Sequence, residues 1–170
     1  LIDDLFQMAQ LDAGGFPLHR AEASLNDLLS DTLESFTELA KQQELLLEGN
    51  VDSDVDPVLM DTQAIGRVLN NLIGNSLRHT ANKGRVSVWV RRTTQGVELT
   101  VSDTGTGIRA DDLPHIFERF YRGDAARSRS RGTGAGLGLA IARGIVQAHG
   151  GDIKVDSEIG KGTQFTFYIP

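Results

Sequence analysis

The sequence predicts an α+β fold: a two-layer α/β sandwich in which a mixed, mostly antiparallel sheet packs against three helices. Three long segments place apolar residues at helical spacing and begin near Ser24, Asp61 and Gly136. Shorter segments alternate apolar and polar residues, which is typical of strands with one buried face. The chain has 170 residues, of which 39% are hydrophobic, and is therefore long enough for one buried core.

The first twelve residues form an amphipathic segment of their own. Their leucine and methionine residues lie at helical spacing, but this apolar stripe has no separate counterpart in the sequence. The paired glycines at positions 14 and 15 favour the turn that closes a helix. We therefore expect residues 1–15 to be the end of a longer helix with its linker, and residues 16–170 to form the folded domain.

The elements of that domain follow from capping residues, turns and periodicity. Ser24 or Asn26 can cap its first helix, and Asp61 can cap its second. Gly150 and Gly151 can end the third. In chain order, we expect a strand near 17–23, a helix from 24 or 26 to 39, strands at 45–48 and 57–60, a helix at 61–80, strands at 86–90 and 97–101, a short helical piece at 111–117, a helix at 136–149, and strands at 152–156 and 163–169.

Composition and charge exclude several classes of function. The chain has no cysteine, which excludes disulfides, thiolate catalysis and cysteine-bound zinc. It contains no apolar run near the length that spans a bilayer. Its net charge of −6 argues against a nucleic-acid partner, because such binding needs clustered positive charge.

Positive charge is nevertheless concentrated in one segment, between positions 109 and 131. Such a segment suggests a small anionic ligand or an acidic partner, or else a solvated loop kept soluble by its charge. The six arginines in it are Arg109, Arg119, Arg122, Arg127, Arg129 and Arg131.

The second helix carries a polar face near its end. Asn71, Asn75, Arg78 and His79 are spaced by four, three and one residues and share that face. Two carboxamides beside a guanidinium and an imidazole suit oxyanions and a hydrated Mg²⁺ ion, which keeps several waters and needs few protein oxygens. The alternative is a polar face that meets only solvent.

A carboxylate followed by glycines ends the strand at 97–101. Asp103 precedes Gly105 and Gly107, and can accept a hydrogen bond from a ligand amine while the glycine backbone stays close to that ligand. The same residues also make a plain turn, since Asp-Thr-Gly is common turn chemistry.

A second glycine run leads directly into the third helix. Glycines before a helix N-terminus expose backbone N–H groups to an anion, and the helix dipole favours negative charge there. The run is neither a Walker A motif nor a Rossmann fingerprint, because no Gly-Lys-Ser/Thr and no parallel βαβ unit accompany it. Together, the two runs predict a pocket for a nucleotide. The glycines of the second run are Gly132, Gly134, Gly136 and Gly138.

Five motifs, in order, resemble those of bacterial sensor histidine kinases. The resemblance covers residues 20–170 and implies the ATP-binding sandwich that these kinases share with gyrase, Hsp90 and MutL, a Bergerat-type fold. Residues 71–79 resemble the N box, 103–108 the G1 box, 116–122 the F box, 132–140 the G2 box, and Gly162-Thr163 with Phe165 the closing strand.

The resemblance implies ATP and Mg²⁺ as ligands. Asp103 would accept from the adenine amino group, with Thr163 helping through an ordered water. Asn75, and Asn71 with it, would hold magnesium and phosphate oxygens.

Further roles follow from the same resemblance. Arg78 stands where the family often has a lysine that meets phosphate, and His79 where a tyrosine often packs on adenine. Backbone N–H groups of the second glycine run would meet the phosphates. Further pocket residues would be Gly105, Gly107, Ile108, Gly134, Gly136, Leu137 and Gly138.

Residues 109–133 would form a lid over the ATP. Phe117 and Phe120 would anchor this lid, with Tyr121 beside them at the nucleotide, and Arg122 is a candidate contact to the γ-phosphate.

Position 71 bears on the type of reaction. The ATP hydrolases of the wider group carry a glutamate there that activates water, whereas Asn71 cannot act as a general base. This favours transfer of the γ-phosphoryl group to another nucleophile, with Asn71, Asn75, Arg78 and Arg122 supplying positioning and charge neutralisation.

The family's phosphoacceptor is a histidine in a helical hairpin, within a His-Glu-x-x-Thr-Pro type motif that this chain lacks. We expect His19, His115 and His149 to be structural or exposed. The resemblance implies that residues 1–15 are the remnant of the second helix of this dimerisation and phosphotransfer hairpin, with its linker. The chain would then be the catalytic part of a larger kinase, monomeric by itself, which binds ATP without phosphorylating itself.

The partners implied by the resemblance are the kinase's own phosphoacceptor hairpin and a response regulator protein, with no nucleic acid. The parent would be a homodimer whose catalytic part is cytoplasmic and which is anchored in the bacterial inner membrane. Two alternatives are an anti-sigma-type serine kinase of the same fold and a module that binds nucleotide only to regulate a partner.

Overall fold

A computed structural model of the chain describes residues 2–14, 16–123 and 135–170. The elements, in order, are α1 (Ile2–Asp12), β1 (Ala21–Ala23), α2 (Leu25–Gln42), β2 (Leu46–Val51), β3 (Val58–Met60), α3 (Thr62–His79), β4 (Arg85–Thr93), β5 (Gly96–Asp103), the short 3₁₀ helix η1 (Leu113–His115), α5 (Gly138–Ala148), β6 (Ile153–Glu158) and β7 (Gly162–Ile169).

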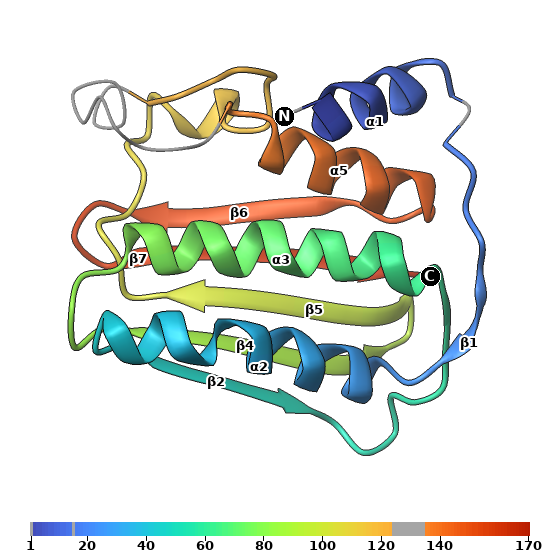
Figure 1. The fold of residues 1–170 in the computed structure, drawn as a ribbon, viewed down its shortest axis with the longest axis horizontal. Coiled ribbons are helices and arrows are strands. Elements are labelled where there is room, and N and C mark those ends of the chain that lie inside the picture. Colours follow the sequence, from blue (N-terminus) through green and yellow to red (C-terminus); the bar gives the residue numbers. More distant parts are fainter. Residues whose placement is uncertain (1, 15, 124–134) are drawn as a thin grey trace.

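Five of the strands form one mixed sheet with the order β2-β4-β5-β7-β6. β2 pairs with β4 in parallel, and the other neighbours are antiparallel. β1 and β3 form a separate antiparallel pair. Helices α2, α3 and α5 lie along one face of the large sheet (Figure 1), which confirms the predicted two-layer α+β sandwich.

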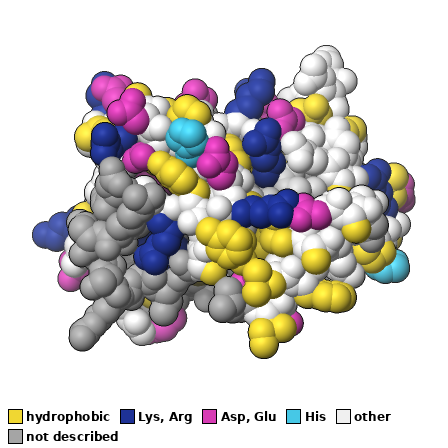
Figure 2. Space-filling model, turned by 90° about the horizontal axis from the view of Figure 1, so that it is seen from above, with side chains coloured by type: hydrophobic (Ala, Val, Ile, Leu, Met, Phe, Trp, Pro, Cys, Tyr) yellow, Lys and Arg dark blue, Asp and Glu magenta, His cyan; other side chains and the backbone are white. Residues whose placement is uncertain are grey.

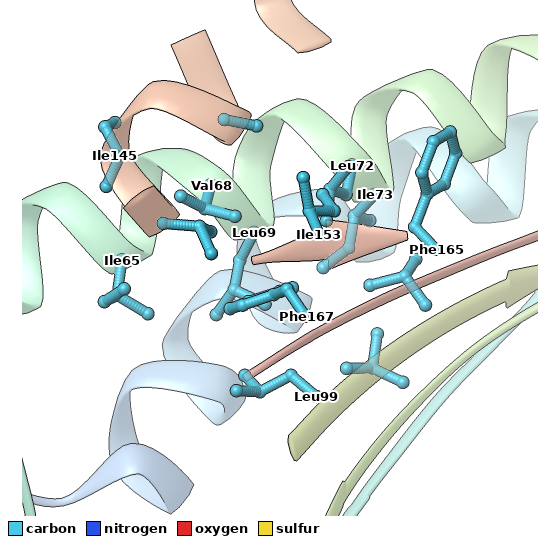
Figure 3. Close-up of a cluster of buried hydrophobic side chains, with 14 of the residues drawn as sticks. Ile65, Val68, Leu69, Leu72, Ile73, Leu99, Ile145, Ile153, Phe165 and Phe167 are labelled. Carbon is cyan, nitrogen blue, oxygen red and sulfur yellow. The ribbon is translucent and has the colours of Figure 1, made fainter. Parts of the chain in front are cut away.

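The core lies between α3 and the sheet. Ile65, Leu69 and Leu72 point from α3 toward Phe165 and Phe167 of β7 (Figure 3), and all five side chains are buried. Burying a side chain of this size contributes about 1.5–3 kcal/mol. Asn71 and Asn75, which are half-buried, lie on α3 outside this apolar face.

A hydrogen-bonded cluster fixes the start of α3 and the end of α5. The Asp61 carboxylate caps α3 by accepting from the Ala64 backbone N–H at 3.0 Å, and also accepts from the His19 N–H at 2.8 Å. The Asp61 N–H donates to Nε2 of His149 at 3.2 Å. His149 is 2% exposed and thus structural, as expected.

α1 packs on α5, contrary to the expectation that its apolar stripe has no counterpart. Met8 is buried, and Leu11 lies 2.7 Å from the place where a Cβ on Gly144 would stand, so the missing side chain makes room for it. Ion pairs join Asp4 to Arg67 of α3 and Asp12 to Arg119. The contact was not predictable, because a glycine within a helix gives no sign of what fills the space above it.

The side of the molecule with α1 and η1 carries hydrophobic side chains among charged ones (Figure 2). On α1 the large hydrophobic residues that are exposed are Ile2, Leu5 and Phe6. Among the described residues, no helix is both long and apolar enough to cross a membrane.

The other face of the sheet is lined by polar pairs. Ser102 of β5 donates to Oε1 of Gln164 on β7 at 3.2 Å, and Arg91 of β4 pairs with Glu98 of β5. Trp89, on β4, is 52% exposed on this face.

Candidate functional site

The predicted site residues converge at one end of the sheet. The last turn of α3, the end of β5, the end of β6 and the start of β7 all lie at the left of Figure 1. Backbone contacts tie these ends together: the Thr106 N–H donates to the carbonyl of His79 at 3.1 Å, and the Gly160 N–H donates to the carbonyl of Thr106 at 2.9 Å.

Asp103 is the last residue of β5, and its carboxylate is 8% exposed. Oδ1 accepts from the backbone N–H of Gly105 at 2.9 Å and from that of Thr163 at 3.2 Å. Within the described residues, Oδ2 has no hydrogen-bond partner. Oδ1 thus makes the hydrogen bonds of the turn expected of Asp-Thr-Gly. Oδ2 is left as an acceptor in a fixed position.

Gly105 and Gly107 bring the loop close to two other segments. A Cβ on Gly105 would lie 2.5 Å from the carbonyl oxygen of His79. Gly107 has a φ of +74°, and a Cβ there would lie 2.1 Å from the carbonyl oxygen of Glu158. These glycines are therefore required by the fold itself, whatever ligand the loop meets.

Ser157, on β6, is a residue of this site that the sequence interpretation missed. Its Oγ accepts from the Ile108 N–H at 2.8 Å, donates to the Gly162 carbonyl at 2.9 Å and lies 2.9 Å from Oγ1 of Thr163. It joins the loop after β5 to the start of β7. A serine in a strand carries no local signal of this role, because its partners lie far away or on the next strand.

The polar face of α3 divides into two parts. The Asn71 amide donates to the carbonyl of Gly138 at 3.0 Å, at the first turn of α5. Asn75 is half-buried and makes no side-chain hydrogen bond within the part of the chain that the structure describes. Arg78 and His79 are exposed beyond it. Asn71 thus holds the two helices together, while the Asn75 carboxamide remains open.

Phe117 anchors the described first part of the predicted lid. Its ring packs edge-on against Phe165, with centroids 6.3 Å apart, and the Arg143 guanidinium lies 5.5 Å from its centroid. The hydroxyl of Tyr121 donates to Oδ1 of Asp112 at 2.6 Å.

Phe120 does not anchor the lid with its side chain, which corrects the expectation. The ring is 60% exposed, and the residue has a φ of +58°. Its backbone N–H instead donates to the carbonyl of Gly136 at 3.0 Å. Gly136 has a φ of +72°, and a Cβ there would lie 2.9 Å from the carbonyl oxygen of Tyr121. The backbone of Phe120, within the expected lid, is thus joined to that of Gly136, which follows it.

The remaining predicted residues are placed as follows. Ile108 and Gly138 are half-buried, Leu137 is 2% exposed, and Arg122 is half-buried after the F-box segment. Gly132, Gly134 and the arginines at 127, 129 and 131 lie outside the described residues, as does the part of the expected lid from 124 to 133.

Comparison with known proteins identifies the family. Residues 60–170 match the family described as histidine kinase-, DNA gyrase B-, and HSP90-like ATPase. The chain belongs to this family, and its fold and motifs are those of the catalytic domain of sensor histidine kinases.

Individual relatives agree. The chain is 36% identical to the adaptive-response sensory kinase SasA of Microcystis aeruginosa, covering 100% of this chain and 44% of that protein. It is 38% identical to the sensor histidine kinase WalK of Bacillus subtilis, covering 100% of this chain and 28% of that protein. The chain therefore spans less than half the length of these relatives.

Solved structures share the fold. Full-length ShkA in complex with AMPPNP superposes with a TM-score of 0.88 at 30% identity, over 99% of this chain and 35% of that one. The nucleotide-free catalytic domain of the histidine kinase ThkA superposes with a TM-score of 0.76 at 26% identity, over 89% of this chain and 95% of that one.

Proposed function

We propose that this chain binds ATP at the Asp103 end of the sheet and transfers the γ-phosphoryl group to a histidine of a phosphoacceptor hairpin. The observation that carries the proposal is the buried Asp103 carboxylate. One of its oxygens is held by two backbone N–H groups, and the other remains a fixed acceptor. A ligand amino group, such as that of adenine, supplies the matching donor.

The phosphates fit the region between α3 and the start of α5. The N-terminus of α5 offers backbone N–H groups and the positive end of its dipole. Gly134, Gly136 and Gly138 would present these N–H groups, and Arg78 and Arg122 would supply positive charge. The AMPPNP bound by the related ShkA supports a nucleoside triphosphate as the ligand.

The donor set also fits a magnesium ion held partly by phosphate oxygens. Asn75 presents a half-buried carboxamide, and Asn71 keeps its Oδ1 after its amide donates to Gly138. Mg²⁺ accepts such oxygen ligands and retains waters, and when bound it neutralises phosphate charge. Asn75 would be the principal protein ligand and Asn71 the secondary one.

The reaction would form a bond between a histidine ring nitrogen and the γ-phosphorus as the bond to the β,γ-bridging oxygen breaks, releasing ADP. No side chain has to remove a proton from water, in keeping with an asparagine at position 71. This chain would contribute positioning and positive charge, which is the usual contribution of proteins to phosphoryl transfer.

The whole protein would pass the phosphoryl group from the hairpin to a response regulator. We further propose that the parent is a homodimer whose catalytic part lies in the cytoplasm, and that it is anchored in the inner membrane. The names of the relatives, which are sensor kinases, support this role.

Calorimetric titration with ATP and Mg²⁺ tests the proposal. Asp103→Asn keeps an acceptor for Gly105 and Thr163 but turns the other oxygen into a donor. We expect it to lower ATP affinity about tenfold to a hundredfold, the loss of one charge-assisted hydrogen bond. Asp156→Asn, an exposed change on β6, is the matched control and should bind like wild type.

The result that contradicts ATP binding is the absence of heat on titrating wild type. If ATP binds, the next assay adds a matched phosphoacceptor hairpin and follows labelled phosphate. Acid-labile phosphate on the hairpin supports histidine phosphorylation, whereas acid-stable phosphate on a partner serine indicates a serine kinase. Binding without any transfer indicates a regulatory module.

A further inference from the structure

The hydroxyl of Ser157 has all of its hydrogen-bonding capacity in use. A serine hydroxyl has one proton to donate and two lone pairs to accept. Three partners lie around this Oγ: the Ile108 N–H at 2.8 Å, the Gly162 carbonyl oxygen at 2.9 Å and the Thr163 hydroxyl at 2.9 Å. The number of partners equals the number of bonds that the group can make.

The chemistry of these partners fixes the direction of each bond. The Gly162 carbonyl can only accept, so it takes the proton of Ser157. The Ile108 N–H can only donate, so it uses one lone pair of Ser157. The remaining lone pair faces Oγ1 of Thr163, and only the Thr163 proton can fill it.

The Thr163 hydroxyl therefore donates its one proton to Ser157, and toward any other partner it can only accept a hydrogen bond. Thr163 is 8% exposed, and its backbone N–H donates to Oδ1 of Asp103 at 3.2 Å. The acceptor lone pairs of Thr163 and the open Oδ2 of Asp103 thus belong to two residues that are joined by a hydrogen bond from the Thr163 backbone N–H to the Asp103 carboxylate. Together they make a polar edge with acceptors and no side-chain donor.

We propose that Ser157 is a positioning residue that sets the base specificity of the site by holding the Thr163 hydroxyl as an acceptor. An edge of this kind favours a purine with an amino group, directly or through one water, over a purine with a carbonyl group at the same position. The inference rests on the proposed ATP site and adds to it the residue that controls one of its two base-reading groups.

The test is the ratio of the dissociation constants for inosine triphosphate and ATP, measured calorimetrically. Ser157→Ala removes the acceptor that holds the Thr163 proton, so the Thr163 hydroxyl can turn and donate to the 6-oxo group of inosine. We expect the preference for ATP to fall roughly three- to tenfold, the range of one neutral hydrogen bond. Ser157→Thr keeps the hydroxyl and should retain the wild-type ratio.

A double-mutant comparison locates the effect. Thr163→Val removes the acceptor itself and should also lower the ratio of the dissociation constants for inosine triphosphate and ATP. It leaves the hydrogen bonds of Ser157 to Ile108 and Gly162 in place. In the Thr163→Val background, Ser157→Ala should then change the ratio no further. If Ser157→Ala does not fold, Thr163→Val alone still tests the inference, because an unchanged ratio in that variant would show that the Thr163 hydroxyl does not read the base.

Ser102→Ala is the matched control, since it also removes a serine hydrogen bond between two strands, but on the other face of the sheet. It should leave the ratio unchanged. If Ser157→Ala weakens both nucleotides equally, Ser157 is merely structural and the inference is wrong. If wild type binds no ATP, the proposed function fails instead, so the two failures are distinguishable.

Discussion

The side-chain amide of Asn71 donates a 3.0 Å hydrogen bond to the carbonyl oxygen of Gly138, and so joins the middle of α3 to the first residue of α5. A carboxylate at position 71 could not donate this bond. The residue from which we expect phosphoryl transfer rather than hydrolysis is therefore also a contact between two helices.

Asn71→Asp should destabilise the chain and should not create an ATP hydrolase, because the aspartate carboxylate is one methylene group shorter than the glutamate expected of the hydrolases. The new carboxylate would face the Gly138 carbonyl oxygen without a proton between them, at a cost of about 1–3 kcal/mol. Urea denaturation measures this cost, and phosphate release measures hydrolysis. Asn70→Asp is the control, because the exposed Asn70 side chain bonds, among the described residues, only to the Gly66 carbonyl of its own helix, and the change should cost little. Equal costs for the two variants would contradict the role of the Asn71–Gly138 bond.

Asn75→Ala should lower ATP affinity about tenfold when Mg²⁺ is present, because it removes the open carboxamide that we assign to the ion. With EDTA in place of Mg²⁺, wild type and variant should bind ATP with similar affinity. Asn70→Ala, on the same helix, should behave like wild type under both conditions. An effect of Asn75→Ala that persists in EDTA would mean that Asn75 contacts the nucleotide rather than the metal.

Gly107→Ala should be among the most destabilising single changes in the loop after β5. The φ of +74° alone costs an alanine about 1–2 kcal/mol. The added Cβ would also meet the Glu158 carbonyl oxygen at 2.1 Å, so the β6–β7 turn has to move. Gly160→Ala separates the two effects, because Gly160 has a φ of +81° with nothing within 4 Å of its Cβ position. Thermal unfolding should show a clearly larger loss for Gly107→Ala than for Gly160→Ala.

Asp56→Ala should destabilise α2 although residue 56 lies outside that helix. The Asp56 carboxylate accepts from the Ser24 hydroxyl and from the Leu25 N–H, each at 2.6 Å. Burial alone would raise the pKa of Asp56, but the hydrogen bonds from Ser24, Leu25 and Asn26 outweigh it and lower that pKa. The stabilisation is therefore complete above the ordinary value of 3.8 and is lost as the pH falls through the lower folded value.

At neutral pH, Asp56→Ala should cost about 1–3 kcal/mol in urea denaturation, because the buried Leu25 N–H loses its acceptor. Asp54→Ala, two residues earlier and exposed, keeps the backbone carbonyl that Arg92 uses and should cost little. A large loss in both variants would indicate a general disturbance of this loop.

His149→Gln should remove part of the pH dependence of stability. Burial lowers the pKa of His149, and the positive charge of Arg20 lowers it further, against the raising effects of the Ile145 carbonyl and Asp61. The folded state then keeps the ring neutral while the unfolded state takes a proton near pH 6.5. Stability is complete above that pH and falls as the pH is lowered toward the folded value, by at most about 1.4 kcal/mol per pH unit.

Denaturation series between pH 5 and pH 8 measure that slope. His149→Gln should flatten it, whereas His19→Gln, an exposed change in the segment that contacts Asp61 only through its backbone N–H, should leave it unchanged. A slope that survives in His149→Gln would assign the pH dependence to another group.

Features set by neighbours in the chain could be predicted from the sequence. Asp61 caps a helix that ends at His79, one residue before the expected end, because capping and apolar spacing are both local. Asp103 at the end of β5 and the turn at Gly96 follow from equally local patterns. These features place the polar face of α3 and the loop after β5 at the same end of the molecule.

Features that depend on distant contacts could not be predicted. Ser157, the capping role of Asp56 and the packing of Leu11 over Gly144 each join segments whose meeting depends on the whole fold. Phe120 shows the converse: an aromatic residue in a motif suggests burial, yet its positive φ and its backbone bond to Gly136 leave the ring exposed.

Trp89 gives the molecule an optical reporter that is separated from the site. It is the one tryptophan in the sequence, and it lies half-exposed on the sheet face opposite the helices. Its emission should respond to unfolding of β4 and should remain nearly constant when a ligand binds at Asp103. A change in tryptophan fluorescence during a nucleotide titration would therefore indicate that the sheet itself is deformed.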